Sequence, residues 1–376
     1  MKTLIPTADY PPIEGGISTV TVHLARQLAA LGHEVTVIAP YFPDMEAFDA
    51  SEPVNVVRYR GYHWGWLRFL PMLATSWRFA VGCEAILAMN VAYGGVIGML
   101  ARARRGTPYL AFAYAYEFMK FRKTPLLGGL LRRVYNRAKA VIAISEFTRG
   151  NLLDFGVEDC RIEVVLPGAA AHVRVSQAEI RAVRHKFVLD DNPVILSVGR
   201  LIPRKNHIAL VRALPGILER IPSAVLLIAG QGPCMWEICQ EAHRLGVREQ
   251  LVMPGKVEDA DLAALYAACD VFALPAGAST RGQVEGFGLV FSEAHAHAKP
   301  VVAGNSGGVP EAVLDGETGI LVDPGDPEAI AEAVVRILED PALAQRLGHN
   351  GRKRIEAELN WAAFARRVAH ILEDQP

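Results

Sequence analysis

The sequence predicts an α/β fold made of two doubly wound domains, each a parallel sheet covered by helices. Short apolar runs alternate with helical patterns along the whole chain, which is typical of repeated β-α-β units. At roughly 150 residues per domain, the length of 376 residues corresponds to two domains. Hydrophobic residues make up 51% of the chain and charged residues 21%, so disordered and collagen-like chains are excluded.

The amino-terminal half opens with a β-α-β unit. Gly15-Gly16 precedes an amphipathic stretch with apolar residues at helical spacing, and Gly32-His33 ends that helix. Residues 34–39 then form a strand closed by Pro40, which favours a parallel sheet. Further strands are expected at residues 85–89, 109–113, 140–144 and 162–166.

A second set of strands begins at residues 193–199. The strands that follow are expected at residues 224–229, 251–253, 271–274, 300–303 and 319–322, with helical patterns between them. Residues 169–192 carry only a short helical pattern, which is typical of a linker. We therefore expect one domain over residues 1–169 and another over 170–360. The amphipathic segment 360–374 can pack on either domain.

Charge and cysteine usage exclude several classes of protein. With 39 Lys+Arg against 40 Asp+Glu, the chain is not a globally basic nucleic-acid binder. Five cysteines without Cys-x-x-Cys spacing favour a reduced, cytoplasmic protein over a disulfide framework or a zinc site. The apolar stretch 81–100 contains Glu84, Asn90 and Gly94-Gly95, and predicts a buried strand, a turn and a core helix rather than a membrane span.

Residues 285–293 form the most informative segment. Glu285 lies in a glycine-rich turn and Glu293 lies eight residues later, inside the helix that follows. Gly286 and Gly288 let the backbone approach a ligand, and the N–H groups of residues 287–290 would point at an anion. Carboxylates beside such a site accept hydrogen bonds from sugar or ribose hydroxyls. The alternative is a solvated helix-start Glu followed by a helix-face Glu.

A second segment, residues 199–207, directly follows a predicted strand. It places Arg200 and Lys205 at the same carboxyl edge, where two cations can neutralise a diphosphate. The alternative is an ordinary basic surface turn. Because ligands of facing α/β sheets bind at the carboxyl ends of the strands, we expect a phosphorylated ligand in a cleft between the domains.

These motifs together resemble the family-4 retaining glycosyltransferases of the GT-B fold. The resemblance rests on the Glu-x7-Glu motif, the Gly-Arg-x4-Lys turn, the amino-terminal loop 10–17, the segment 144–149 and residues 297–319. It covers nearly the whole chain. Residues 304–308 also resemble phosphatidylinositol mannosyltransferases, which hints at GDP-mannose and a lipid acceptor, although UDP-sugars are the commoner donors of the family.

The resemblance implies a role for each matching residue. Arg200 and Lys205, in the turn after Gly199, would hold the donor diphosphate, and Glu285 would bind the donor sugar. The other implied donor contacts are Gly16, Gly199, Gly230, Val257, Gly286, Phe287, Gly288, Leu289, Val290 and Glu293, the last on the ribose hydroxyls. The resemblance also implies that the final helix, about residues 361–376, packs back on the amino-terminal domain, which would carry the acceptor.

One catalytic position departs from the family pattern. Tyr114 stands where the family usually has a histidine after the strand at 109–113. A tyrosine hydroxyl can donate a hydrogen bond to a sugar, but it titrates far above neutral pH. The catalytic set implied by the resemblance is therefore Arg200, Lys205, Glu285 and Tyr114.

The expected activity is that of a hexosyltransferase-type enzyme. It would move a sugar from a UDP- or GDP-linked donor to an acceptor hydroxyl on a glycan, a lipid or a small molecule, with retention, without metal and without a further cofactor. The alternative is a non-catalytic homologue that binds nucleotide sugar or partners an active transferase. The Glu-x7-Glu pair disfavours an epimerase, and no Gly-x-Gly-x-x-Gly follows the first strand, which disfavours a dehydrogenase.

Charge is concentrated in residues 102–139. Ten basic residues stand there against a single acid, mixed with apolar residues, and residues 62–67 add aromatic side chains. Such a face can contact an anionic membrane or a phosphorylated acceptor. The alternative is a solvated basic helix face. We therefore expect a cytoplasmic protein that does not bind nucleic acid. Through this basic face it can also contact the inner membrane surface peripherally.

Overall fold

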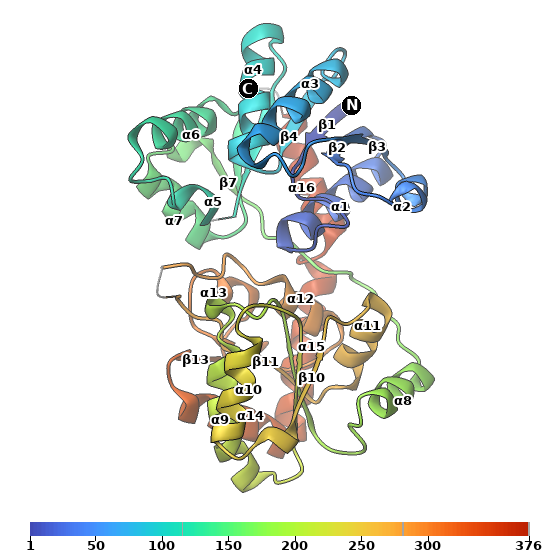
Figure 1. The fold of residues 1–376 in the computed structure, drawn as a ribbon, viewed down its shortest axis with the longest axis vertical. Helices are drawn as coiled ribbons and strands as arrows, with labels where there is room; N and C mark the ends of the chain where they lie inside the picture. Colours follow the sequence, from blue (N-terminus) through green and yellow to red (C-terminus); the bar gives the residue numbers. More distant parts are fainter. Residues whose placement is uncertain (115, 280–281, 375–376) are drawn as a thin grey trace. The chain divides into compact units, whose positions relative to one another are not determined.

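The computed structural model describes residues 1–114, 116–279 and 282–374, and it divides the chain into two compact units. Unit 1 comprises Met1–Pro167 together with Trp361–Pro376, and unit 2 comprises Gly168–Asn360 (Figure 1). Each unit is an α/β layer structure built on a parallel sheet, as the sequence predicts.

Unit 1 contains a seven-stranded parallel sheet within the described residues, in the order β3-β2-β1-β4-β5-β6-β7. Its strands are β1 (Lys2–Pro6), β2 (Glu34–Pro40), β3 (Asn55–Tyr59), β4 (Ala85–Ala88), β5 (Tyr109–Ala113), β6 (Ala140–Ala143) and β7 (Ile162–Val164). The order reverses between β1 and β4, so the carboxyl ends of these two strands form the switch point of the sheet. Strand β3 was not predicted, because this edge strand is only half-buried and lacks a strong apolar run.

Helices cover both faces of this sheet. They are α1 (Gly16–Ala30), α2 (Glu46–Ser51), α3 (Phe69–Phe79), α4 (Val96–Arg105), α5 (Tyr116–Met119), α6 (Pro125–Arg137), α7 (Glu146–Phe155) and α16 (Trp361–Glu373), with shorter turns at Gly65–Arg68 and Val91–Gly95. The prediction of a strand, a turn and a core helix over residues 81–100 is confirmed by β4 and α4. None of the helices formed by the described residues has the length and hydrophobicity that a membrane crossing needs.

Helix α16 packs on α1 although the two are more than 300 residues apart. The imidazole of His23 stacks on the indole of Trp361, with ring centroids 4.6 Å apart and planes 2° from parallel. Burial in this contact lowers the pKa of His23 to about 4, so the ring is neutral at physiological pH. The carboxyl-terminal helix is thus an integral part of unit 1.

Unit 2 contains a six-stranded parallel sheet, within the described residues, in the order β10-β9-β8-β11-β12-β13. Its strands are β8 (Val194–Val198), β9 (Val225–Ala229), β10 (Leu251–Gly255), β11 (Val271–Leu274), β12 (Val301–Gly304) and β13 (Gly319–Val322). Its helices are α8 (Gln177–Lys186), α9 (His207–Arg220), α10 (Met235–Arg244), α11 (Asp259–Ala268), α12 (Leu289–Ala296), α13 (Val309–Ala312), α14 (Pro327–Glu339) and α15 (Pro341–Ala357).

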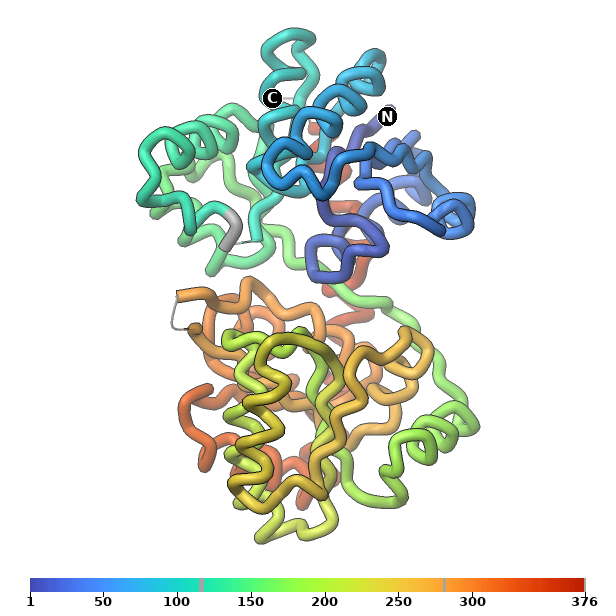
Figure 2. The backbone as a smooth tube through the Cα atoms, viewed as in Figure 1, coloured from blue at the N-terminus to red at the C-terminus, as the bar shows by residue number. Residues whose placement is uncertain are grey.

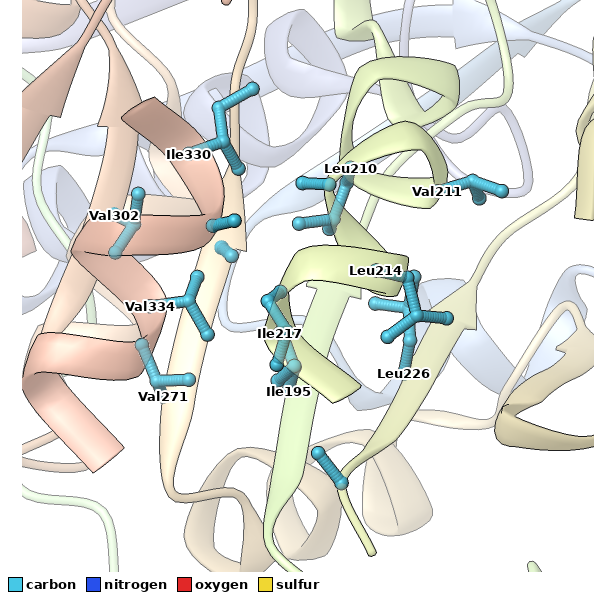
Figure 3. Close-up of a cluster of buried hydrophobic side chains, with 14 of the residues drawn as sticks. Ile195, Leu210, Val211, Leu214, Ile217, Leu226, Val271, Val302, Ile330 and Val334 are labelled. Atoms are coloured by element: carbon cyan, nitrogen blue, oxygen red, sulfur yellow. The ribbon is translucent and has the colours of Figure 1, made fainter. Parts of the chain in front are cut away.

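The core of unit 2 lies between its sheet and the pair α9 and α14 (Figure 3). Leu210, Leu214 and Ile217 of α9 belong to this layer, with Ile217 next to Ile195 of β8, and Val334 of α14 completes it. All of these side chains are fully buried, which fixes the two helices on the central strands. This packing holds the amino-terminal ends of the helices at the carboxyl edge of the sheet.

Residues 169–192 do not form a free linker. Helix α8 in this segment packs on α11 (Figure 2). Its Arg184 donates hydrogen bonds to the carbonyls of Ala268 and Asn192, both at 2.6 Å. The weak helical pattern reflects a helix that buries only Val183. The segment therefore belongs to unit 2.

Candidate functional site

The carboxyl edge of the unit 2 sheet is built from glycine turns that pack backbone on backbone. The N–H of Gly199 donates to the carbonyl of Ala229 at 3.0 Å, and the N–H of Gly230 donates to that of Gly255 at 2.7 Å. Gly230 has a φ of 150°, and a β-carbon there would lie 1.9 Å from the carbonyl oxygen of Gly199. Only glycine fits this contact, which brings the turns after β8, β9 and β10 together.

Two cations meet one carboxylate at this edge. The Nζ of Lys205 lies 2.8 Å from Oε2 of Glu285, and the guanidinium of Arg204 donates to the same oxygen. The side chains of Lys205, Glu285 and Arg204 are 9%, 12% and 19% exposed, so the cluster is largely withdrawn from water. Two positive charges against one negative charge leave a local excess of one positive charge. Such a cluster favours an anionic ligand.

The protonation state of Glu285 follows from its neighbours. Burial raises the pKa of its carboxyl, but the charges and hydrogen bonds of Lys205 and Arg204 outweigh burial, and the pKa falls below its ordinary 4.5. Glu285 is therefore ionised at neutral pH.

Asn206 holds the turn that carries the two cations. It adopts a left-handed conformation with a φ of 54°, and its Nδ2 donates to the carbonyls of Pro275 at 3.1 Å and Pro324 at 2.7 Å. On the other side of the cluster, the N–H of Gly308 donates to the carbonyl of Glu285 at 3.0 Å. The backbones of both partners are thus fixed by neighbouring loops of the same edge.

Helix α12 begins beside this cluster. Its N-cap is Gly288, with a φ of 94°, where a β-carbon would lie 2.5 Å from the ring of Phe291. The Phe287 side chain is buried, whereas Leu289 and Val290 are partly exposed in the first turn. The first N–H groups of a helix have no partner within the helix, and its dipole is positive there. The start of α12 is therefore suited to oxygen atoms of an anion.

Glu293 lies one turn further along α12 and is held by Tyr266 of α11. The Tyr266 hydroxyl donates to its Oε2 at 2.8 Å, and the Tyr266 ring stacks on His297 with centroids 5.5 Å apart. Burial raises the pKa of the Glu293 carboxyl, while the Tyr266 hydrogen bond opposes that rise. His295 is buried on the same helix, and its Nε2 lies 3.0 Å from the carbonyl oxygen of Thr318, so its contact lies away from Glu293.

Comparison with known proteins decides the family. Residues 14–172 match the family model of Glycosyltransferase Family 4, and residues 179–354 match that of Glycosyl transferases group 1. A GDP-mannose-dependent alpha-(1-6)-phosphatidylinositol monomannoside mannosyltransferase of Mycolicibacterium smegmatis is 33% identical over 98% of this chain and 97% of its own length. The chain belongs to the family-4 glycosyltransferases. The resemblance inferred from the sequence motifs is confirmed.

Other relatives of this glycosyltransferase agree with that assignment. A GDP-mannose-dependent monoacylated alpha-(1-6)-phosphatidylinositol monomannoside mannosyltransferase of Corynebacterium glutamicum is 30% identical over 100% of this chain and 98% of its own. The crystal structure of Anabaena HepE with UDP and glucose shares the fold, with a TM-score of 0.84 at 22% identity over 99% of both chains. Sucrose-phosphate synthase from Thermosynechococcus elongatus has a TM-score of 0.81. The predicted GT-B fold is confirmed.

The predicted donor residues of the glycosyltransferase differ in whether they contact the Glu285 cluster. The structure brings Lys205 and Glu285 into contact, and it places Gly199, Gly230 and Gly286 in turns of the same edge. Val257 lies two residues beyond β10, also at this edge. Arg200, by contrast, is exposed, and its guanidinium makes no ion pair or hydrogen bond with any described residue. The cation beside Lys205 is Arg204.

Two predicted site residues belong to unit 1. Gly16 is the first residue of α1, and Tyr114 directly follows β5, so both lie at the carboxyl edge of the unit 1 sheet. Arg58 secures the loop before α1, because its guanidinium donates to the carbonyls of Pro11 at 2.7 Å and Pro40 at 3.0 Å. This loop is therefore positioned by the fold of unit 1 itself.

Metal ligands do not gather in the described part of the glycosyltransferase. No group of three or more His, Cys, Asp or Glu side chains there is arranged to hold a metal ion. Asp259-Ala260-Asp261 has the Asp-x-Asp spacing of metal-using transferases and opens α11. Its Asp261 instead pairs with Lys186 at 2.5 Å. Acidic residues in a first helical turn also stabilise that helix end.

Three residues of the site were missed by sequence reasoning: Arg204, Asn206 and Tyr266. The sequence does indicate Arg204, because it is a second cation next to Lys205. Spacing alone, however, does not show whether Arg204 or Arg200 contacts Glu285. Asn206 is also indicated, because Asn is favoured where a turn requires left-handed backbone. Nothing in the sequence indicates Tyr266. It reaches Glu293 from another helix, a contact that depends on tertiary structure.

Proposed function

We propose that this glycosyltransferase transfers a hexose from a nucleoside diphosphate sugar to an acceptor hydroxyl with retention of the anomeric configuration. The observation that carries the proposal is the cluster of Lys205 and Arg204 on Glu285 at the start of α12. A buried site with excess positive charge next to a helix N-terminus suits a diphosphate, and a carboxylate in the same place suits sugar hydroxyls.

Stabilising the leaving diphosphate is the main chemical task in this proposal. As the glycosidic bond of the donor breaks, the bonding electrons go to the diphosphate oxygen, and the new charge is met by Lys205, Arg204 and the N–H groups of Leu289 and Val290. The acceptor hydroxyl attacks the anomeric carbon from the same face, and its proton goes to the leaving diphosphate. Fixed cations can supply this stabilisation without a metal ion.

Donor binding would also rearrange the ion pair. Diphosphate oxygens compete with Glu285 for Lys205 and Arg204, which frees the carboxylate to accept hydrogen bonds from the sugar. Arg200, exposed at the same edge, can add a further contact to the phosphates. The pair thus holds Glu285 in place until the donor arrives.

GDP-mannose is the first donor to test, and a glycolipid hydroxyl the first acceptor. Support comes from the full-length relatives at 30–33% identity, which are named GDP-mannose-dependent mannosyltransferases of a phosphatidylinositol monomannoside. UDP-sugars belong in the same panel, because the structural neighbour HepE was crystallised with UDP and glucose.

The test combines thermal shift with turnover. Purified protein is incubated with GDP-mannose, UDP-glucose or ADP-glucose, with EDTA or with added Mg²⁺, and nucleoside diphosphate release is measured. We expect one donor to raise the melting temperature and to be hydrolysed slowly in EDTA. NMR of a transferred product reads the anomeric configuration. An inverted product, or turnover only with Mg²⁺, would refute the corresponding part of the proposal.

A non-catalytic homologue is the second candidate, and Tyr114 is the observation that favours it. The side chain stands where the family usually carries a histidine. Tyr114→Phe separates the two candidates, because loss of its hydroxyl lowers turnover only if the hydroxyl touches the donor sugar. Donor binding without turnover in wild type, even with a mannosylated lipid supplied, would support the non-catalytic candidate.

We also propose peripheral membrane contact through unit 1. The basic side chains of residues 102–137 are exposed, and α6 adds Leu126, which is 91% exposed. Within residues 62–67, the Trp64 and Trp66 side chains are 61% and 78% exposed. Cations with exposed aromatic and aliphatic side chains suit an anionic headgroup region. Sedimentation with vesicles that contain phosphatidylinositol, compared with neutral vesicles, tests this contact.

A further inference from the structure

Outside the donor cluster, unit 2 carries a groove along the outer faces of α9 and α10. The two helices pack against each other (Figure 1), and the groove between them has a volume of about 430 Å³. Ligand pockets typically measure roughly 300 to 1,000 Å³. The groove is therefore large enough for a small ligand.

One wall of the groove is an exposed tryptophan. Trp236, in the first turn of α10, is 73% exposed, although burial of such a large apolar side chain is normally favourable. Ile208 of α9 also lines the groove and is partly buried. The apolar part of the groove is thus confined to one flat ring and one aliphatic side chain.

The floor of the groove is a fixed polar network. Glu241 accepts hydrogen bonds from Arg212 at 2.6 Å and from Arg244 at 2.8 and 3.0 Å. These bonds lower the pKa of the Glu241 carboxyl to about 2, so it stays ionised. The Glu241 side chain is 11% exposed, whereas those of Arg212 and Arg244 are 50% and 64% exposed. Their remaining N–H groups can donate to a ligand.

Two further polar side chains of the groove have hydrogen-bonding groups that the protein itself does not use. Glu237 and Gln240 line it and are exposed, and their side chains make no hydrogen bond with any other described residue. A carboxylate supplies acceptors only, while a primary amide supplies both donors and an acceptor. The groove thus offers both kinds of hydrogen-bonding group beside the Trp236 ring.

We propose that this groove binds an uncharged oligosaccharide segment. A sugar ring presents an apolar C–H face, which stacks on an aromatic ring, and a rim of hydroxyls, which exchange hydrogen bonds with carboxylate, amide and guanidinium groups. The lining contains two arginines and two glutamates, so their formal charges cancel and a phosphate-bearing ligand has no advantage. A stable protein partner needs about 800 Å² on each side with an apolar centre, which one tryptophan does not supply.

The position of the groove gives the binding a role. Helix α9 starts directly after Lys205 and Asn206, and α10 starts shortly after the Gly230 turn. The groove therefore begins at the edge of unit 2 that carries the candidate donor site. Bound there, a glycan acceptor or product would be held at high local concentration beside the donor. This role rests on the proposed transferase activity, whereas the binding itself does not.

The test measures glycan binding apart from catalysis. Wild-type protein with GDP or UDP in excess is titrated with α-linked mannotriose and with maltotriose, by ligand-observed NMR and calorimetry. Trp236→Ala removes the stacking ring, Trp236→Phe keeps a smaller one, and Trp66→Ala removes a tryptophan that is 78% exposed in unit 1. We expect one trisaccharide to bind wild type, Trp236→Ala to weaken it about tenfold, and the other two variants to retain binding.

Three results would overturn the proposal: neither trisaccharide binds wild type, Trp236→Ala binds as tightly as wild type, or Trp66→Ala loses binding equally. The nucleotide-induced thermal shift should be the same in Trp236→Ala as in wild type, which shows that the variant is folded. A failure of donor turnover with intact trisaccharide binding would count against the proposed function and leave the groove assignment in place.

Discussion

The two units of the molecule pair their cations with carboxylates in opposite ways. In unit 1, Arg58 forms a two-bond pair with Asp49, at 2.9 and 2.6 Å, and Arg26 forms one with Glu52, at 3.0 and 2.5 Å. Each cation there has a carboxylate of its own. In unit 2, the Lys205 and Arg204 cations share a single oxygen of Glu285. The charges of the unit 1 pairs are therefore balanced, whereas the unit 2 cluster has one more positive charge than negative charge.

This difference separates a structural ion pair from a binding site. A buried pair with matched charges and filled hydrogen bonds gains nothing from a further anion. A buried cluster with an extra cation is stabilised when an anion arrives, because that anion supplies the missing negative charge. We therefore expect variants of the unit 1 pairs to change stability, and variants of the unit 2 cluster to change donor binding and turnover.

The largest effect is expected at Lys205. Lys205→Met keeps the alkyl stem that packs near Gly199 but removes the charge that meets the leaving diphosphate. We expect kcat/KM to fall by about 10² to 10³, the usual loss for one group that stabilises a transition state. Lys186→Met, which breaks the exposed pair with Asp261, is the control and should retain wild-type kinetics. Equal activity of both variants would contradict the assignment.

Arg58→Met should give the largest change in stability. It removes the pair with Asp49 and two hydrogen bonds to loop carbonyls in a side chain that is 9% exposed. Breaking such a pair costs about 3 kcal/mol, which corresponds to a fall in melting temperature of roughly 6 °C or more. Scanning calorimetry measures it. If the nucleotide affinity of the folded variant fell instead, the comparison between the units would be wrong.

Arg204 and Arg200 sharpen the comparison within unit 2. Arg200→Ala removes an exposed cation, so we expect a donor KM increase of about tenfold with no change in melting temperature. Arg204→Ala removes a partner of Glu285, so both the melting temperature and kcat should fall. Steady-state kinetics and thermal denaturation of the two variants decide the order. An unchanged melting temperature in Arg204→Ala would mean that its contact with Glu285 contributes little.

The smallest effect is expected in the pH dependence of stability. Because the pKa of Glu285 is lowered in the folded state, its contribution is present above the unfolded value and is lost as pH falls through the folded value. The difference in melting temperature between wild type and Glu285→Gln should therefore be constant near neutral pH and shrink below the ordinary pKa of 4.5. A difference that grows toward low pH would contradict the ionised state of Glu285.

The sequence predicts those parts of the fold that depend on local pattern. Residues 109–113 and 271–274 form fully buried strands, and their continuous apolar runs predict them. Strand β3 is a half-buried edge strand, and its pattern is too weak to find. Helix α8 was predicted only as a helical pattern within a linker, because its contact with α11 is a tertiary feature.

The site is predictable where a backbone motif creates it. The glycine turn at 286–288 and the Glu-x7-Glu spacing identify the start of α12 and both carboxylates. Which cation meets Glu285 is a different kind of question. The short helical turn at Pro203–Lys205 directs Arg204 and Lys205 to one oxygen and leaves Arg200 in solvent, and spacing does not reveal that geometry.

The most direct test of the account is donor binding to wild type and to Lys205→Met, measured by calorimetry with GDP-mannose and UDP-glucose. The account predicts that one donor binds wild type and that its affinity falls at least tenfold in Lys205→Met, while Lys186→Met binds as wild type does. Equal affinity of wild type and Lys205→Met for the donor would contradict the claim that the incompletely paired cluster of unit 2 is the donor site.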